Sequence, residues 1–565
     1  MRRHAGVAVV VLLLTVAAGL RLVRLGWPDL VGGDEGYYGT YARNLLEGGL
    51  EQWLNLGREP LSAPDNKPFL FPALLAVAVA LAGPTGWALR SVPALAGFVA
   101  AALAGLLVRR RFGAAAGWSA TIAMLLLPPL VYASRVVMGE GILVAFGLAG
   151  TWAAVRALEE DRSGLAWIAG ALWGCGFLVK LWLVGLYIAP VVLALLCSRR
   201  RFAPAPWGRL VLAAGAFVLV GGAHLFLVAL LSPATMPHWI EQYFIFSLFG
   251  RASGQEFAAY WHQPWSFYLR ATLQTCFMAW PLAVVALTQR AEAAETEERS
   301  LPQLVLWGAL AGELLLVSFM GVKLRQYSFP LLPGLATLAG IGAATLLRRP
   351  ERVRPAAAAA LTAAALLPLA AWQLAATPLF PSRTMAAAVA LTLAASALLL
   401  AFGGGGGASR RRLAFPTLVG AMTLAAVAGS ALTVQRECLG HRTGYREAAA
   451  AVAPYLAERT PTDAAFLAPE LPAFQFLLFR SGRYWATPYE ARGVEEQLAL
   501  AADPRFAAFV TTDRADLYGG ATPPAVVDWL AAHQREITAE VERSAGRSLP
   551  IRVFVHPLAA PGAPR

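Results

Sequence analysis

Charge is scarce in this chain, and lysine is almost missing from it. Only 14% of the residues are charged, against roughly 25% in soluble domains. Of the 47 basic residues only three are lysines, Lys67, Lys180 and Lys323. So few charges among 58% hydrophobic residues argue against one large soluble core and predict a helical membrane protein with many spans.

Motifs of several common function classes are missing too. Four scattered cysteines without CxxC or Cys/His spacing support neither a disulfide framework nor a structural zinc site. There is no GxxxxGK[ST] or GxGxxG, so no phosphate loop of a nucleotide-binding protein is expected. The net charge of +13 comes from short arginine clusters between apolar runs. That pattern is typical of the positive-inside rule and argues against nucleic acid as a partner.

Apolar runs of about 20 residues, the length that crosses a bilayer, predict about 13 transmembrane helices. The candidates are 5–25, 91–108, 113–132, 138–157, 165–179, 181–197, 209–231, 265–289, 301–321, 327–347, 355–374, 385–402 and 413–434. The first candidate follows a charged start but has no small-residue cleavage site, so we interpret it as an uncleaved anchor.

The arginine clusters predict the orientation of these spans. Every arginine cluster faces the cytoplasm if the apolar stretch 68–83 does not cross the membrane. We expect a juxtamembrane helix at 68–83 because this stretch is short and contains Pro68 and Pro72. The N-terminus is then inside. The predicted outer segments are 26–67, 133–138, 232–264, 322–326 and everything after about 435. All three lysines fall at the outer face, Lys180 at the turn between two spans.

The chain changes character at about residue 436. Short apolar runs at 464–469 and 506–513 are typical of strands, 444–461 and 523–536 of helices, and 548–557 of a closing strand. We therefore predict a membrane module over 1–435, with a first outer loop at 26–90, and a small α/β domain over 436–565 on the outer side.

Three carboxylates are predicted at the outer face. Asp34 and Glu35 start a predicted helix that ends at Gly48 and Gly49, and an acidic pair there is either a helix cap at the interface or an acid/base or metal-binding pair. Glu140 lies just inside a span, where a carboxylate is a functional candidate by default. Its simplest alternative role is an ion pair with Arg135.

Cations and a histidine are predicted at the same face. Lys67 precedes the juxtamembrane helix and either snorkels to the interface or holds a phosphate. Cations outside the membrane break the positive-inside pattern, which favours an anionic partner. His262 could be a metal ligand or a substrate contact. The cations predicted at this face are Lys67, Arg270, Lys323 and Arg325, and Tyr327 lies at the same outer turn as Lys323 and Arg325.

This combination suits transfer from a membrane-anchored phosphate donor. Cations would stabilise the negative charge on the leaving phosphate, and one carboxylate would take a proton from the attacking hydroxyl. A transporter or flippase of lipid-linked or anionic substrates is the alternative, since charges within spans also mark transport paths. A membrane scaffold is a further rival, but it would leave these clustered charges unexplained.

Five motifs together resemble the GT-C glycosyltransferases of the protein O-mannosyltransferase and lipid A aminoarabinose transferase family. They are "GGDEGYYGTYARNLLEGG", "NKPFLFPALLA", "RVVMGEGIL", "HQPWSFY" and "KLRQYSFPLLP", in that order over residues 1–350. Some relatives have a glutamate where Asn66 stands here, and its absence weakens a metal site at His262.

The resemblance implies an inverting transfer from a polyprenyl-phosphate sugar to a lipid, glycan or protein acceptor. Asp34 would be the base, with Glu35 and Glu140 beside it. The resemblance also implies that the lipid phosphate is surrounded by Lys67, Arg270, Lys323, Arg325 and Tyr327. A divalent metal ion at His262 is the one cofactor it leaves open. It also implies a bacterial inner-membrane enzyme whose active site and C-terminal domain face outward.

Overall fold

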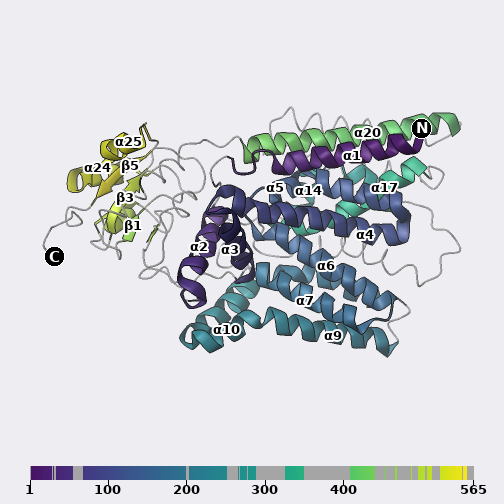
Figure 1. Ribbon diagram of the computed structural model, residues 1–565, viewed down its shortest axis with the longest axis horizontal. Helices are drawn as coiled ribbons and strands as arrows, with labels where there is room; N and C mark the ends of the chain where they lie inside the picture. The colour runs from purple at the N-terminus through teal and green to yellow at the C-terminus, as the bar shows by residue number, and fades with distance from the viewer. Residues whose placement is uncertain are drawn as a thin grey trace.

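The computed structural model shows a bundle of helices with a small sheet beyond one end (Figure 1). The structure describes residues 2–27, 30, 33–54, 68–196, 198, 203–250, 265, 267–276, 278–287, 325–348, 408–439, 452, 465–467, 485–486, 494–502, 506–511, 522–546, 548–549 and 551–555. The predicted fold class, a polytopic helical membrane protein with a small C-terminal α/β part, is confirmed.

Long helices form the body of the bundle. They are α1 (Arg2–Leu22), α4 (Gly86–Leu126), α6 (Gly139–Glu159), α7 (Ser163–Lys180), α8 (Gly185–Leu196), α9 (Pro204–Gly221), α17 (Leu332–Arg348) and α20 (Ala408–Thr433). Shorter helical elements connect them: α5 (Pro128–Ala133), η1 (Leu181–Val184), α10 (Ala223–Leu231), α14 (Phe267–Thr275), α15 (Trp280–Leu287), η6 (Arg325–Leu331) and η8 (Val434–Cys438). In the described part of the chain, six helical segments are long and apolar enough to cross a membrane.

The segment called α4 is two helices rather than one. Gly113 interrupts it with φ +84°, a left-handed conformation that glycine adopts without strain. Twelve residues of straight helix would separate Gly105 from Gly117 by about 18 Å. Instead, a Cβ on Gly105 would lie 2.9 Å from the Gly117 carbonyl oxygen, so the chain has turned back on itself. The two predicted spans 91–108 and 113–132 are the two arms of this hairpin.

A second reversal follows α7. Leu181 has φ +52°, and the chain then returns along α6. Gly139, at the start of α6, contacts the Lys180 side chain, whereas Thr151, three turns further on, donates a hydrogen bond to the Tyr187 carbonyl at 3.3 Å. The predicted spans 165–179 and 181–197 are therefore also an antiparallel pair.

Every candidate span on described residues contains helix, which agrees with the sequence prediction. The candidates 301–321, 355–374 and 385–402 lie outside the described residues, so the total of about 13 stays a prediction. α3 (Leu70–Ala82) rises about 20 Å, too short for a bilayer core of about 30 Å. This agrees with a juxtamembrane helix there.

Two details of the prediction were wrong. α2 (Gly33–Leu54) does not end at Gly48 and Gly49 but continues for another turn, because a glycine inside a helix costs only about 1 kcal/mol. The predicted outer loop 232–264 is helical in its described part, where η3 (Pro233–Thr235) and α11 (Met236–Ile240) lead into the π-helix η4 (Glu241–Gly250).

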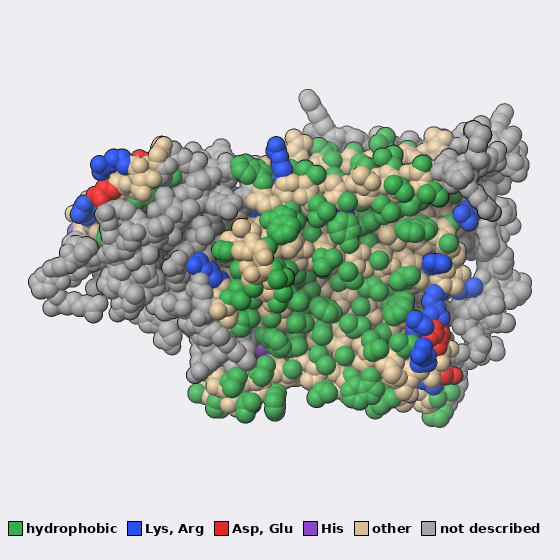
Figure 2. All heavy atoms as spheres, viewed as in Figure 1, with side chains coloured by type: hydrophobic (Ala, Val, Ile, Leu, Met, Phe, Trp, Pro, Cys, Tyr) green, Lys and Arg blue, Asp and Glu red, His purple; other side chains and the backbone are tan. Residues whose placement is uncertain are grey.

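The two ends of the bundle differ in chemistry. We call them the α2 end, where α2 and α3 lie in Figure 1, and the arginine end, where the chain turns between α6 and α7. Figure 2 shows hydrophobic side chains covering the face between them, while basic and acidic side chains gather at the arginine end. An apolar belt bounded by a charged end is what a bilayer requires.

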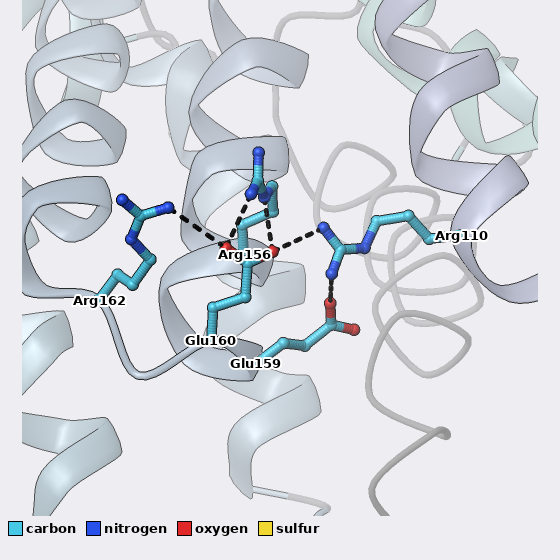
Figure 3. A network of polar contacts seen from close by, with 5 residues as sticks. All are labelled: Arg110, Arg156, Glu159, Glu160 and Arg162. Carbon is cyan, nitrogen blue, oxygen red and sulfur yellow. Dashed lines mark hydrogen bonds and ion pairs between the residues drawn. The ribbon is translucent and has the colours of Figure 1, made fainter.

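A network of ion pairs holds the arginine end together (Figure 3). Glu160 accepts hydrogen bonds from Arg156 at 2.7 Å and from Arg110 at 2.9 Å. Arg110 also pairs with Glu159 at 3.0 Å, and Arg162 approaches Glu160 at 3.8 Å. The network ties the turn of the α4 hairpin to the α6–α7 turn.

The network predicts an acid-sensitive increment of stability. Hydrogen bonds from Arg156 and Arg110 lower the pKa of Glu160 from 4.5 to about 2. A carboxylate whose pKa is lower in the folded than in the unfolded chain stabilises the fold at any pH above its unfolded-state pKa. This stabilisation is lost as the pH falls through the folded-state pKa. We expect Glu160→Gln to lower the melting temperature at neutral pH, with the difference from wild type vanishing between pH 4.5 and about 2.

Thermal melts of the detergent-purified chain across this pH range measure that difference. Glu159→Gln is the matched control, because Glu159 pairs with Arg110 in the same network and its loss leaves both bonds to Glu160 in place. A difference between wild type and Glu160→Gln that stays constant down to pH 2 would contradict the linkage.

The C-terminal residues form one five-stranded sheet in the order β2-β1-β3-β5-β4. The strands are β1 (Ala465–Leu467), β2 (Trp485–Ala486), β3 (Phe506–Thr511), β4 (Arg535–Glu536) and β5 (Arg552–Val555). β1 pairs in parallel with β2 and β3, and β5 pairs antiparallel with β3 and β4. Phe509, Leu530 and Phe554 form its core with helices α23 (Val494–Ala501) and α24 (Pro524–His533).

The predicted strands at 464–469, 506–513 and 548–557 and the helix at 523–536 are confirmed. The predicted helix at 444–461 lies outside the described residues apart from Val452. α23, α25 (Thr538–Ala545), β2 and β4 were not predicted, since they are short and α25 is mostly polar. The division of the chain at residue 435 stays a prediction.

Candidate functional site

The acidic pair at the start of α2 is divided between two environments. Asp34 and Glu35 both lie in the first turn, where the helix dipole favours negative charge. Adjacent residues on a helix point about 100° apart, so the two side chains diverge. Asp34 is half-buried and Glu35 is fully buried.

Glu35 binds the guanidinium of Arg90 through both carboxylate oxygens. The Arg90 Nε and Nη2 atoms donate to it at 2.8 and 2.7 Å, and the Val137 backbone N–H donates at 2.9 Å. Arg90 also donates to the Leu25 carbonyl at 3.2 Å. This arrangement, which we call the Glu35–Arg90 clamp, fastens the start of α2 to α4, to the turn before α6 and to the end of α1.

Glu140 pairs with Lys180 rather than with Arg135. Its carboxylate, in the first turn of α6, has no exposed surface and lies 3.1 Å from the Lys180 ammonium. Among the described residues it accepts no hydrogen bond of good geometry. Gly139 allows this approach, because a Cβ there would lie 3.2 Å from the Lys180 side chain.

Arg135 instead caps the end of α1. It donates to the carbonyls of Leu20 and Arg21 at 2.8 and 2.9 Å and to that of Val23 at 2.9 Å. Arg21 in turn donates to the Leu125 carbonyl at 2.6 Å, at the end of α4. The ion pair between Arg135 and Glu140 considered above is therefore not formed.

Charged and polar side chains at the α2 end gather around Lys180. Besides Glu140, the carboxylate of Asp34 acts on its ammonium electrostatically, and the neutral hydroxyl groups of Tyr38 and Tyr327 lie in the same region. Asp34 and Tyr38 come from α2, and Tyr327 from η6. Both tyrosines are buried. Four segments far apart in the sequence thus bring two carboxylates, two phenols and one cation together.

The remaining predicted residues are placed only in part. Lys67, His262 and Lys323 lie outside the described residues. For Arg270 in α14 and Arg325 in η6 the structure describes the backbone alone. No group of three or more His, Cys, Asp or Glu side chains able to hold a metal ion occurs within the described ranges, so the metal site at His262 stays a prediction.

Sequence reasoning missed Lys180 and Arg90 as members of the site. The rarity of lysine and the predicted outer position of all three singled Lys180 out, but no motif placed it beside a carboxylate. Arg90 was overlooked although it lies at the predicted outer end of a span, where an arginine departs from the positive-inside pattern; no motif placed it beside Glu35.

Solved structures resemble this arrangement over almost its full length. ArnT from Cupriavidus metallidurans, bound to undecaprenyl phosphate, matches with a TM-score of 0.63 and 19% identity, covering 98% of this chain and 99% of its own. The chain has the GT-C fold. The apo state of the same protein matches this GT-C chain with a TM-score of 0.62.

A second GT-C structure and a sequence family also match. The archaeal oligosaccharyltransferase AglB from Archaeoglobus fulgidus, in complex with an inhibitory peptide and a dolichol-phosphate, matches with a TM-score of 0.51 and 13% identity. The match covers 90% of this chain and 69% of the AglB chain. The family described as dolichyl-phosphate-mannose-protein mannosyltransferase matches residues 66–223. No curated protein matches the sequence.

Proposed function

We propose that the chain transfers a sugar from a polyprenyl-phosphate donor to an acceptor on the outer side of the membrane, with inversion at the sugar carbon. The observation that carries this proposal is the convergence of Asp34 and the Glu140–Lys180 pair at the α2 end of a GT-C fold. The site contains a proton acceptor and a buried cation, the two groups that the reaction needs.

Asp34 is the base in this reaction. It takes the proton from the acceptor hydroxyl as the oxygen attacks the sugar C1. The bond from C1 to the phosphate oxygen breaks on the opposite side, which inverts the configuration. Polyprenyl phosphate leaves with the bonding electron pair, and Asp34 passes the proton to solvent.

Lys180 stabilises the charge that appears on the leaving phosphate. Glu140 holds the ammonium in place and keeps it charged in its buried setting. Lys67, Arg270, Lys323, Arg325 and Tyr327 complete the phosphate site in this proposal. ArnT bound to undecaprenyl phosphate and AglB in complex with a dolichol-phosphate support a lipid phosphate as donor.

Glu35 has a different role from the one the acidic pair suggested. Both of its oxygens are engaged by Arg90 and Val137, so it is a poor proton acceptor for a substrate. We assign it to positioning, because the Glu35–Arg90 clamp sets where the first turn of α2, and so Asp34, lies. The transporter alternative has no comparable support, since the matched family and AglB are named as transferases.

Release of undecaprenyl phosphate from an undecaprenyl-phosphate sugar tests the proposal directly. The purified chain is mixed with radiolabelled donors of several sugars and with lipid, glycan and protein acceptors in turn. Transfer of label with stoichiometric release of undecaprenyl phosphate is the expected result. Counterflow of intact donor across a vesicle membrane without release would favour the transporter instead.

The same proposal places the α2 end outside the inner membrane of a bacterium. In a variant without its four natural cysteines, Pro84→Cys in intact spheroplasts should react with a membrane-impermeant thiol reagent. Ser163→Cys, exposed at the arginine end, should react only after lysis. Labelling of both sites, or of Ser163→Cys alone, in intact cells would contradict this orientation.

A further inference from the structure

A stack of three aromatic rings that the proposed reaction does not use lies beside the site. His224 in α10 has no exposed surface and stacks with both Phe69 and Tyr243. Its ring centroid lies 6.0 Å from that of Phe69 and 5.4 Å from that of Tyr243, with interplanar angles of 16° and 22°. Trp239 covers its edge at 4.6 Å. We call Phe69, His224 and Tyr243 the His224 stack.

One end of the His224 stack meets the segment that carries Lys180. Tyr243 packs edge-on against Phe177 at 6.0 Å, and its carbonyl accepts a hydrogen bond from the Trp182 indole at 2.7 Å. Phe177 precedes Lys180 by three residues and Trp182 follows it by two. The helix breaks at Leu181, directly after this lysine, so contacts on both sides of the break help to hold it in place.

The other end of the stack leads to Asp34. Phe69 directly precedes α3, whose Phe71 packs against Tyr38 with ring centroids 4.3 Å apart. Tyr38 lies one helical turn after Asp34 in α2. Two groups of contacting rings, joined through the backbone between Phe69 and Phe71, therefore lead from the base to the cation. We call them the ring series, and His224 lies in its middle.

Rings suit this task because aromatic side chains have few rotamers and their packing geometry is specific. The centroid distances here are 4.3 Å for Tyr38 and Phe71 and 4.6–6.0 Å for the other pairs, at or close to the 4.5–7 Å of favourable aromatic pairs. The base and the cation lie on separate helices. Asp34 must meet the attacking hydroxyl on one side of the sugar carbon, and Lys180 must meet the leaving phosphate on the other. A displacement of even 1 Å in such a site can reduce the rate greatly.

We propose that His224 is a positioning residue that sets Lys180 at its working distance from Asp34 by holding the ring series together. The proposal rests on the proposed function, in which Lys180 binds the lipid phosphate. The flat ring of His224 positions Lys180 through its stacking contacts, and a proton on the imidazole is not needed.

Two substitutions of similar size separate these properties. His224→Phe keeps a flat ring and removes both nitrogens, whereas His224→Leu keeps bulk and removes the ring. Val228→Ala is the control, since Val228 is equally buried one turn further along α10. The probe is the purified full chain in nanodiscs, binding undecaprenyl phosphate and, separately, undecaprenol.

The readout is the dissociation constant of undecaprenol divided by that of undecaprenyl phosphate. This ratio measures how much the phosphate group adds to binding. Partial unfolding lowers the bound fraction for both lipids and leaves the ratio unchanged. His224→Leu should reduce the ratio about tenfold, the size of one charge-assisted hydrogen bond. His224→Phe and Val228→Ala should stay within about twofold of wild type on the same scale.

A double-mutant cycle with Lys180→Met then tests whether His224 acts through the lysine. The expected result is that His224→Leu has no further effect on the ratio once Lys180 is gone. Additive losses, an unchanged ratio in His224→Leu, or an equal loss in His224→Phe would each overturn the proposal. Wild type that binds the two lipids equally would instead overturn the proposed function itself.

Discussion

Asp34→Asn is expected to lose about 10²- to 10⁴-fold in kcat, the usual contribution of a positioned general base. The substitution keeps the shape of the side chain and its place in the first turn of α2 but removes the basicity. The KM for the donor should change little, because the lipid phosphate contacts cations rather than Asp34. Release of undecaprenyl phosphate under saturating donor measures the effect.

Asp161→Asn is the matched control for this result. Asp161 is an exposed aspartate at the arginine end, paired with Arg209 at 2.7 Å, and its substitution should leave turnover unchanged. Undecaprenyl phosphate binding by Asp34→Asn shows that the variant is folded. A folded Asp34→Asn variant with wild-type turnover would remove Asp34 from the chemistry and leave the reaction without a base.

Lys180→Met should have the second large effect, on both stability and activity. It leaves the Glu140 carboxylate buried without its counter-charge, and breaking a buried ion pair in this way costs about 3–5 kcal/mol. It also removes the cation that stabilises the leaving phosphate. Chemical unfolding of the detergent-purified chain, followed by tryptophan fluorescence, measures the loss of stability.

The double variant Lys180→Met with Glu140→Gln separates these two effects. Replacing both charges removes the unpaired carboxylate, so most of the free energy of unfolding should return. Transfer activity should not return, because the phosphate still lacks its cation. A double variant as active as wild type would mean that Lys180 serves only to neutralise Glu140.

The local parts of the fold could be predicted from the sequence, because a local property determines each of them. Apolar runs of span length produced helices, and Gly113 divides two of them at the predicted boundary. Pro524 starts α24 as its position indicated. The end of α2 was mispredicted because two glycines weaken a helix less than the neighbouring residues support it.

Some residues of the candidate site could be expected from the sequence, but their pairing could not. Asp34, Glu140 and Tyr327 were expected at one face, and they do converge. Which carboxylate meets which cation depends on how helices pack and rotate against one another. Glu35 finds Arg90, 55 residues later, and Glu140 finds Lys180 instead of the nearby Arg135. No local pattern in the sequence encodes these choices.

Arg135, which caps the end of α1, is synthesised long after that helix. Arg135 binds the Leu20 carbonyl across 115 residues of sequence, a length that a ribosome needs about 6–23 s to synthesise. Until then the last carbonyls of α1 have no such partner, and water or lipid headgroups must satisfy them. The first helix thus enters the membrane early but is locked in place only when the α4 hairpin has followed it.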